Sequence, residues 1–224
     1  MKLFFKAMLL SSLIFTIPVI STPQDSVEQT FTNYYNSGKW GVDENGKGIS
    51  GSGSIVENAA PYMSFLENFV KANEIKTIID IGCGDWLFSR HINWNNANYL
   101  GIDVVKRVIE KNNQQFANSK ISFIHGDSNS FVLPNSDLLI CKDVLQHLPH
   151  AEVFKFLKQI HKFKHCLITN DVDAHSLSSN NYDIAPGDDY RTIDLSKAPF
   201  NVKGTKVFTY KSGYVTKQVF YICN

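Results

Sequence analysis

The sequence predicts a single α/β domain in which short parallel strands alternate with helices. Short apolar runs that end in Gly or Asp recur along the chain, as in "TIIDIG", "NYLGID" and "LITND", and segments with helical spacing separate them. Near the C-terminus, residues 206–210 and 217–223 are apolar runs joined by "KSG", with no helix between them. The alternation is typical of βαβ units around a parallel sheet, and the final pair indicates an antiparallel hairpin.

Each predicted element follows from the spacing of its apolar residues. A helix is expected over 55–72, where Tyr62, Phe65, Leu66 and Phe69 recur at helical spacing. The chain has 224 residues, of which 43% are hydrophobic, and this is enough for one sizeable core. The other predicted elements are strands over 77–81, 98–103, 121–127, 137–143 and 165–171 and helices over 105–116 and 151–162.

Residues 1–21 have the features of a signal peptide. Lys2 and Lys6 flank the start of an uncharged, mostly apolar run over 7–20, and a plausible cleavage point lies just before Thr22. The run is shorter than the roughly 20 apolar residues that a membrane-spanning helix needs. We therefore expect export, the alternatives being an uncleaved membrane anchor and a buried N-terminal helix. Residues 22–55 are then expected to form a lid or cap, and 56–224 the main domain.

Charge and cysteine content exclude some classes of function. The formal net charge of +1 provides no basic field that would attract nucleic acid. The four cysteines include no CxxC pair, so a zinc ribbon is not supported. If the last strand runs antiparallel beside 165–171, Cys166 and Cys223 meet at one edge. A disulfide between them is one interpretation for an exported protein, and buried thiols are the other.

A glycine-rich loop follows the first predicted strand, in "DIGCGD". Ligands of open α/β sheets bind outside the carboxyl ends of the strands. Gly82 and Gly84 lack a Cβ atom, so the backbone can approach a ligand closely, and Asp80 can accept hydrogen bonds. A dinucleotide fingerprint would need glycine where Leu87 stands, which argues against NAD or FAD.

The next two strands also end in polar side chains. Asp103 lies about 20 residues after Asp80, a spacing that suits an acidic residue on the hydroxyls of a ribose. Asp127 and Ser128 end the third strand, where an adenine amino group could donate. Each residue alone is better explained as a helix N-cap than as a ligand contact. Together, on successive strand tips beside the glycine loop, they favour a ligand with a ribose and an adenine.

This pattern resembles the class I S-adenosylmethionine (SAM)-dependent methyltransferases. The resemblance rests on Asp80-x-Gly82-x-Gly84, Asp103, Asp127-Ser128 and "DLLICKDVLQHL", in this order over about residues 75–223. It implies SAM as cofactor and a Rossmann-like three-layer sandwich whose seven-stranded sheet is parallel except for the last strand. The blocks "SGSGS", "DIGCGDW", "CKDVLQHL" and "DDYRTIDLSKAPFN" resemble more narrowly a bacterial subgroup. One departure is Asp85, where many members have a third glycine.

The resemblance also implies roles for particular residues. The glycine loop would hold the methionine part of SAM, Asp103 the ribose, and Asp127 with Ser128 the adenine. The hydroxyls and amides of "SGSGS" suit the binding of a carboxylate, so we interpret the segment as a clamp for that group and not as a flexible linker. Ser54 and Glu57 also form a candidate capping box. The candidate cofactor-binding residues are Ser52, Gly53, Ser54, Asp80, Gly82, Cys83, Gly84, Asp103, Val104, Asp127, Ser128 and Lys142.

Candidate catalytic residues lie just past the fourth predicted strand. Methyl transfer depends on positioning, and a general base helps when the acceptor is a hydroxyl or an ammonium. Lys142, Asp143 and His147 are the candidates. Asp143 is equally well explained as an N-cap, and His147, four residues on, could share a helical face with it or simply pack.

The segment from 171 to 205 is expected to form the acceptor side of the pocket, because a loop this long is usually functional or disordered. Its candidate substrate-binding residues are Asp171, Asp173, His175 and Arg191. A metal site in "DVDAH" is the alternative, and we expect none. Trp40 and Trp86 are interpreted as lid aromatics or as core.

The sequence therefore predicts an exported SAM-dependent methyltransferase that acts on a small molecule. The alternatives are a catalytically inactive module that binds SAM or a nucleoside, and a different enzyme that uses such a ligand, since one fold hosts several chemistries.

Overall fold

The sheet of the computed structural model contains seven strands in the order β3-β2-β1-β4-β5-β7-β6. The structure describes residues 26–127, 129–130, 132–185 and 190–224. The first five strands pair in parallel, while β7 is antiparallel to β5 and β6 is antiparallel to β7. The fold class predicted from the sequence is therefore confirmed. The strands are β1 (Thr77–Ile81), β2 (Asn98–Asp103), β3 (Ile121–His125), β4 (Ser136–Lys142), β5 (Phe163–Val172), β6 (Thr205–Ser212) and β7 (Val215–Cys223).

Helices cover both faces of the sheet and make the three layers. On one face, α2 and α3 pack through Tyr62, Leu66 and Ile109. On the other face, α4 packs through Val153 and Phe156. Because both faces are covered, the central strands are almost continuously apolar, as is typical of a parallel sheet. The helices are α1 (Val27–Ser37), α2 (Val56–Ala72), α3 (Lys106–Phe116) and α4 (His150–Leu157), with short 3-10 helices η1 (Ser52–Ser54), η2 (Ser89–His91), η3 (Leu145–His147) and η4 (Ile160–Lys162).

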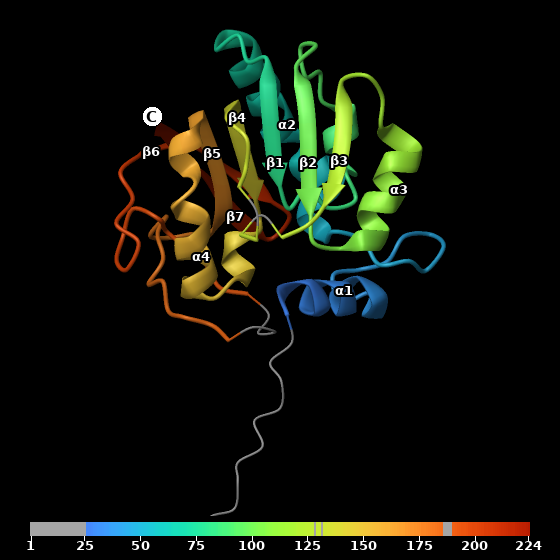
Figure 1. Ribbon diagram of the computed structural model, residues 1–224. Helices are drawn as coiled ribbons and strands as arrows, with labels where there is room; N and C mark the ends of the chain where they lie inside the picture. Colours follow the sequence, from blue (N-terminus) through green and yellow to red (C-terminus); the bar gives the residue numbers. More distant parts are fainter. Residues whose placement is uncertain (1–25, 128, 131, 186–189) are drawn as a thin grey trace, which may run out of the picture.

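The N-terminal helix α1, which the sequence did not predict, lies across the carboxyl ends of the strands (Figure 1). Its first turn is capped by Ser26, whose hydroxyl accepts a hydrogen bond from the Gln29 amide at 3.1 Å. Gly38 ends it in the left-handed conformation, with φ of 65°. In Figure 1 the strands β1, β2 and β3 point toward this helix, so it covers the edge where ligands of such sheets bind.

Two details of the helices differ from the sequence predictions. The helix expected over 151–162 ends at Leu157, and a separate 3-10 turn follows it. Ser54 is not the N-cap of α2. Ile55 occupies that position and no side chain caps the helix, because Ser54 closes the preceding 3-10 turn.

The disulfide between Cys166 and Cys223 is also wrong, since all four cysteines are free. Strand β7 does lie antiparallel to β5, but Cys223 pairs with His165 and Cys166 pairs with Ile222. Neighbouring residues of a strand point to opposite faces, so the offset of one residue places the two thiols on opposite sides of the sheet.

The predicted signal peptide over 1–21 lies outside the described residues. Within the part of the chain that the structure describes, no helix is long and apolar enough to cross a membrane.

Candidate cofactor site

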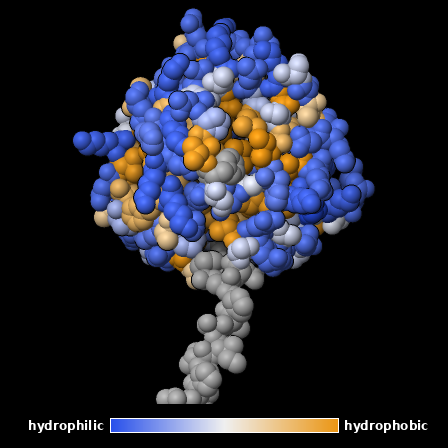
Figure 2. All heavy atoms as spheres, in the orientation of Figure 1, coloured by the Kyte–Doolittle hydropathy of each residue, from blue (hydrophilic) through white to orange (hydrophobic). Residues whose placement is uncertain are grey.

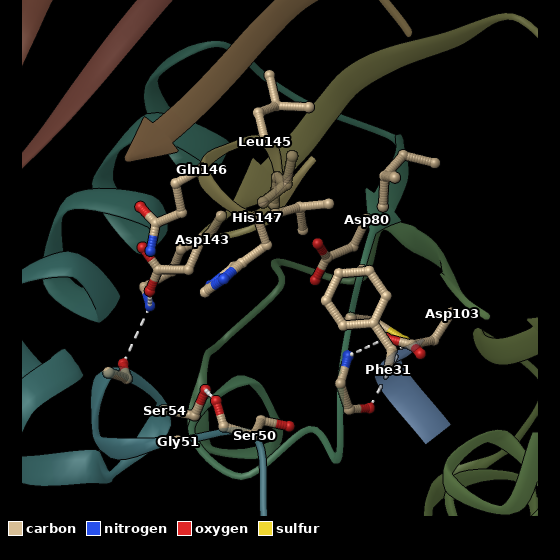
Figure 3. Close-up of a pocket in the computed structure, with 18 of the residues that line it drawn as sticks. Phe31, Ser50, Gly51, Ser54, Asp80, Asp103, Asp143, Leu145, Gln146 and His147 are labelled. Carbon is tan, nitrogen blue, oxygen red and sulfur yellow. Dashed lines mark hydrogen bonds and ion pairs between the residues drawn. The ribbon is translucent and has the colours of Figure 1, made fainter. Parts of the chain in front are cut away.

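A cavity of about 450 Å³ opens at the carboxyl ends of β1, β2, β4 and β5. The glycine loop and Asp103 form one side of it, and the residues after β4 form the other (Figure 3). Helix α1, which carries Phe31 and Tyr35, covers the cavity together with Trp40 and the "SGSGS" loop. Most of the surface in Figure 2 is hydrophilic, and hydrophobic side chains gather near the middle of that face. The volume is in the range of small-molecule and cofactor sites.

The glycine loop has no room for side chains. Gly82 has φ of 71°, and a Cβ atom there would lie 2.2 Å from Val144 Cγ2. Gly84 has φ of 56°, and a Cβ atom there would lie 2.3 Å from Ser50 Oγ. The loop therefore requires glycine at both positions.

The third left-handed position of this loop is Trp86, with φ of 57°, and not Asp85. A glycine at position 86 would relieve backbone strain. The position of this loop that favours a third glycine is therefore Trp86, and not Asp85 as the sequence analysis assigned it. The Trp86 ring packs against Tyr99, Phe116 and Phe123 with centroid distances of 5.2–5.5 Å, so this tryptophan belongs to the core.

Two buried carboxyl groups face the cavity. Asp103 accepts hydrogen bonds from the amides of Gly84 at 3.0 Å and Val105 at 2.9 Å. Burial raises its pKa to about 6, although these two amides oppose the shift. Asp80 accepts a hydrogen bond from the Tyr99 hydroxyl at 2.5 Å, and burial raises its pKa to about 7. Ionised at neutral pH, Asp103 keeps lone pairs that can accept from a diol.

The remaining predicted cofactor residues on this side fall into two groups. Cys83, Val104 and Asp127 line the cavity, although Asp127 also accepts a hydrogen bond from the Asn129 amide at 2.9 Å. Ser128 lies outside the described residues.

The raised pKa of Asp103 predicts a pH-dependent affinity for SAM. Ribose hydroxyls bind best to the ionised carboxylate, so affinity is expected to fall below pH 6, by up to about tenfold per pH unit. Calorimetric titration from pH 8 to pH 5 measures this, and Asp103→Asn should flatten the profile. A wild-type affinity that stays constant over this range would contradict the assignment.

Acid unfolding driven by Asp80 and Asp103 does not explain a loss of SAM affinity at low pH. Folded Asp80 and Asp103 bind protons at higher pH than the ordinary value of 3.8. Their contribution to stability is therefore fully present at low pH and is lost as the pH rises through 6 to 7.

The "SGSGS" loop is attached to the glycine loop through Ser50, which the sequence interpretation missed. The Ser50 hydroxyl donates to Asp85 Oδ1 at 2.6 Å and accepts from the Asp85 amide at 2.8 Å. The Ser50 amide donates to Asp85 Oδ2 at 3.1 Å, and the Tyr35 hydroxyl lies 2.5 Å from Ser50 Oγ. One sequence signal could have indicated this contact. Asp85 is a carboxylate in the glycine loop to which no ligand was assigned, so a partner for it was to be expected elsewhere in the chain.

The other end of the loop rests on the residues after β4. Lys142 Nζ donates to the Gly53 carbonyl at 3.0 Å. The Ser54 hydroxyl donates to the Ser50 carbonyl at 3.4 Å, and no hydrogen bond of the Ser52 hydroxyl is found among the described residues. Ser52, Gly53 and Ser54, three of the candidate cofactor-binding residues, all line the cavity. The segment is therefore not a flexible linker.

Substituting Gly53 with alanine is expected to weaken SAM binding by about tenfold, because overpacking forces the loop or its neighbours to shift. A Cβ atom there would lie 2.9 Å from Asp143 Oδ2 and 3.3 Å from Lys217 Cε. Titration with SAM measures the effect. Gly46→Ala is the control for backbone strain away from the cavity: Gly46 has φ of 73°, but a Cβ there meets nothing within 4 Å, so SAM affinity should match the wild type. Equal affinities for all three proteins would refute a role of the loop in the site.

Asp143 is neither a helix N-cap nor a free base. Its φ of 59° is left-handed, and its carboxylate lies between Lys142 and Lys217. Burial alone would raise the pKa of Asp143, but the two ammonium groups outweigh it and hold the pKa below its ordinary value. The group therefore stays ionised at neutral pH and does not accept a proton there. Lys217, on β7, was absent from the sequence prediction.

His147 lies at the end of η3, not on a helix shared with Asp143. Its ring contacts the rings of Phe31, Trp40 and Tyr190 with centroid distances of 5.2–6.3 Å. All four rings line the cavity, so Trp40 belongs to the cover, as one of the two interpretations held.

The predicted acceptor-side residues separate. Asp171 lines the cavity and pairs with Lys217 at 2.5 Å. Asp173 and His175 are exposed outside the cavity, because Asp173 caps a turn by accepting from the amides of His175 and Ser176. Arg191 is buried and donates to the Leu148 carbonyl at 2.8 Å, also outside the cavity lining. Among the described residues, no cluster of three or more His, Cys, Asp or Glu side chains could hold a metal ion.

Comparison with known proteins agrees with this geometry. Residues 78–164 match the family model described as a methyltransferase domain, a range that holds the glycine loop, Asp103, Asp143 and His147. No curated protein sequence matches the chain.

Solved structures show the same fold. Magnesium protoporphyrin IX methyltransferase from Synechocystis PCC 6803, solved with bound SAM, is 12% identical. The similarity covers 90% of this chain and 98% of that one, with a TM-score of 0.62. The N-methyltransferase NodS from Bradyrhizobium japonicum WM9, solved with S-adenosylhomocysteine (SAH), is 16% identical. Here 75% of this chain and 87% of that one are covered, with a TM-score of 0.54.

The family match and the fold together support a SAM-dependent methyltransferase, with SAM as the cofactor. The cavity fits this cofactor, because it has the volume of a cofactor site and the Asp103 carboxylate, which can accept hydrogen bonds from a diol, lines it.

Proposed function

We propose that this chain transfers a methyl group from SAM to a small-molecule acceptor. The observation that carries the proposal is the cavity itself, in which the Asp80-x-Gly82-x-Gly84 loop and the Asp103 carboxylate meet at adjacent strand ends. Asp103 would hold the ribose and Asp127 the adenine. The "SGSGS" loop, whose Gly53 lies against Asp143 and Lys217, would hold the methionine half. When bound, SAM supplies an electrophilic methyl group.

On the acceptor side, the chain contributes position and a base. His147 is the residue we assign to take the proton from a hydroxyl or ammonium acceptor, since Asp143 is held as an anion by its two lysines. Phe31 on α1 and Trp40 cover the cavity. This cover would exclude water from it and favours a small acceptor over a protein. Lys142 holds the loop through the Gly53 carbonyl and would act in positioning.

Labelled SAM tests this proposal. The purified chain is incubated with methyl-labelled SAM and with separate small-molecule and protein fractions of a bacterial extract. Label should appear in the small-molecule fraction and should be lost in Asp103→Ala. SAM binding without any methyl transfer would instead favour the alternative, a catalytically inactive SAM-binding module.

The leader over residues 1–21 supports export, and the contacts of residues 31–54 with the cavity support their role as a lid. N-terminal sequencing of secreted protein tests the leader. A mature chain beginning at Thr22 is expected, and intact Met1 in a membrane fraction would indicate an anchor.

A further inference from the structure

Three buried charged side chains and the half-buried Asp143 form one network at the acceptor side of the cavity, and we call it the lysine–aspartate network. It consists of Lys142, Asp143, Asp171 and Lys217, all of which line the cavity. Lys217 Nζ lies 2.8 Å from Asp143 Oδ1 and 2.5 Å from Asp171 Oδ1, and Lys142 pairs with Asp143 Oδ2. The Lys217 side chain is 3% exposed and that of Asp143 is 20% exposed. Of this network, the sequence indicated every member except Lys217.

The network is costly to build, which argues that it serves the site. Removing four charges from water carries a desolvation penalty that ion pairing often fails to repay. Asp143 also adopts a left-handed φ of 59°, and strained backbone of this kind clusters at functional sites. The "SGSGS" loop packs directly onto the network, because a Cβ on Gly53 would lie within 3.3 Å of both Asp143 and Lys217.

The position of the network relates it to one half of the cofactor. Asp103 ends β2, whereas the network lies over β4, β5 and β7, across β1 from it. If the ribose lies at Asp103, as the proposed function holds, the half of SAM that carries the sulfonium extends toward the network. Figure 3 shows Asp103 and Asp143 on opposite sides of the cavity, with Asp80 between them.

Charge at this end separates the substrate from the product. SAM carries a positive sulfonium, and the product SAH carries a neutral thioether in its place. The ammonium and carboxylate of the methionine part are common to both. A change in the electrostatic potential of the cavity here therefore alters SAM affinity relative to SAH affinity, while its effects on the shared groups cancel in the ratio.

We propose that the lysine–aspartate network sets the potential at the sulfonium, and that Asp143 and Lys217 thereby determine how strongly the site prefers SAM over SAH. This inference rests on the proposed function. Asp143 contributes a negative charge and Lys217 a positive one, so the two residues act on this preference in opposite directions. Their pKa values support fixed charges, since Asp143 and Asp171 outweigh burial to raise the pKa of Lys217, and the pKa of Asp143 is lowered.

The test is the ratio of the two dissociation constants, Kd for SAH over Kd for SAM, measured by calorimetry. Titration at pH 8.0 keeps Asp80, whose pKa is about 7, mainly ionised in every protein. Asp143→Asn is expected to lower the ratio and Lys217→Met to raise it, each on the order of tenfold. Lys164→Met is the matched control. It breaks the Lys164–Asp137 ion pair at the opposite end of β4 and β5 and should leave the ratio unchanged.

A merely structural network would respond differently. Breaking the pair from either end would then weaken SAM and SAH alike and leave the ratio at its wild-type value. Unchanged ratios, or shifts in the same direction in both variants, would overturn the inference. If Lys217→Met does not fold, Lys217→Gln replaces it, and Asp171→Asn should lower the ratio as Asp143→Asn does. A wild-type chain that binds neither ligand would refute the proposed function itself.

Discussion

Replacing Asp103 with alanine is expected to weaken SAM binding by about 100-fold or more. Each hydrogen bond to a charged group contributes about 1.5–3 kcal/mol, and the carboxylate is assigned two ribose hydroxyls. The Asp103 carboxylate also accepts hydrogen bonds from the amides of Gly84 and Val105, so removing it loosens the glycine loop as well. Calorimetric titration with SAM measures the change, and a thermal melt shows whether the variant is folded.

Asp103→Asn separates the two contributions. The amide keeps an acceptor for the loop but loses the charge, so the fold should be retained and SAM affinity should still fall by about tenfold. Asp137→Asn is a control in which a carboxylate is lost at the far end of the sheet, where Asp137 pairs with Lys164. If Asp103→Asn bound SAM as tightly as the Asp137 variant, the ribose would have to lie elsewhere.

Replacing Asp85 with alanine is expected to lower the free energy of unfolding by about 2–4 kcal/mol and to weaken SAM binding. The side chain accepts from the Ser50 hydroxyl and amide, and these contacts attach the "SGSGS" loop to the glycine loop. Charge-assisted hydrogen bonds that are partly buried contribute at this level. Urea unfolding measures the first effect, and titration with SAM measures the second.

A double-mutant cycle with Ser50→Ala isolates this contact. The two substitutions should be coupled by about 1–3 kcal/mol, since both remove the hydrogen bond between Ser50 Oγ and Asp85 Oδ1. Asp43→Ala serves as the control, because among the described residues the Asp43 carboxylate accepts hydrogen bonds only from the amides of its own turn, Asn45 and Lys47, in the same N-terminal segment. Additive effects of Ser50→Ala and Asp85→Ala would mean that the two residues do not act together.

The parts of the site that follow from local sequence could be predicted. Gly82, Gly84 and Asp103 were assigned because a glycine loop and an acidic strand tip carry their own signal, and strand tips of a parallel sheet share one edge. The order of strands and helices, and the final hairpin, followed from short apolar runs whose spacing is visible in the chain.

Contacts between distant segments could not be predicted in this way. Ser50 and Asp85 are 35 residues apart, and Lys217 and Asp143 are 74 apart, so only the folded chain shows that they meet. The role of Asp143 changed because its partners come from β7 and from the preceding residue. The Cys166–Cys223 pairing failed because a single residue of strand register decides which face a side chain occupies.

Calorimetric titration of the purified chain with SAM tests the central claim most directly. The account predicts saturable binding to one site, with an affinity that drops at least tenfold in Asp103→Asn while the Asp137→Asn control binds as the wild type does. No binding to the folded wild-type chain at millimolar SAM would contradict it.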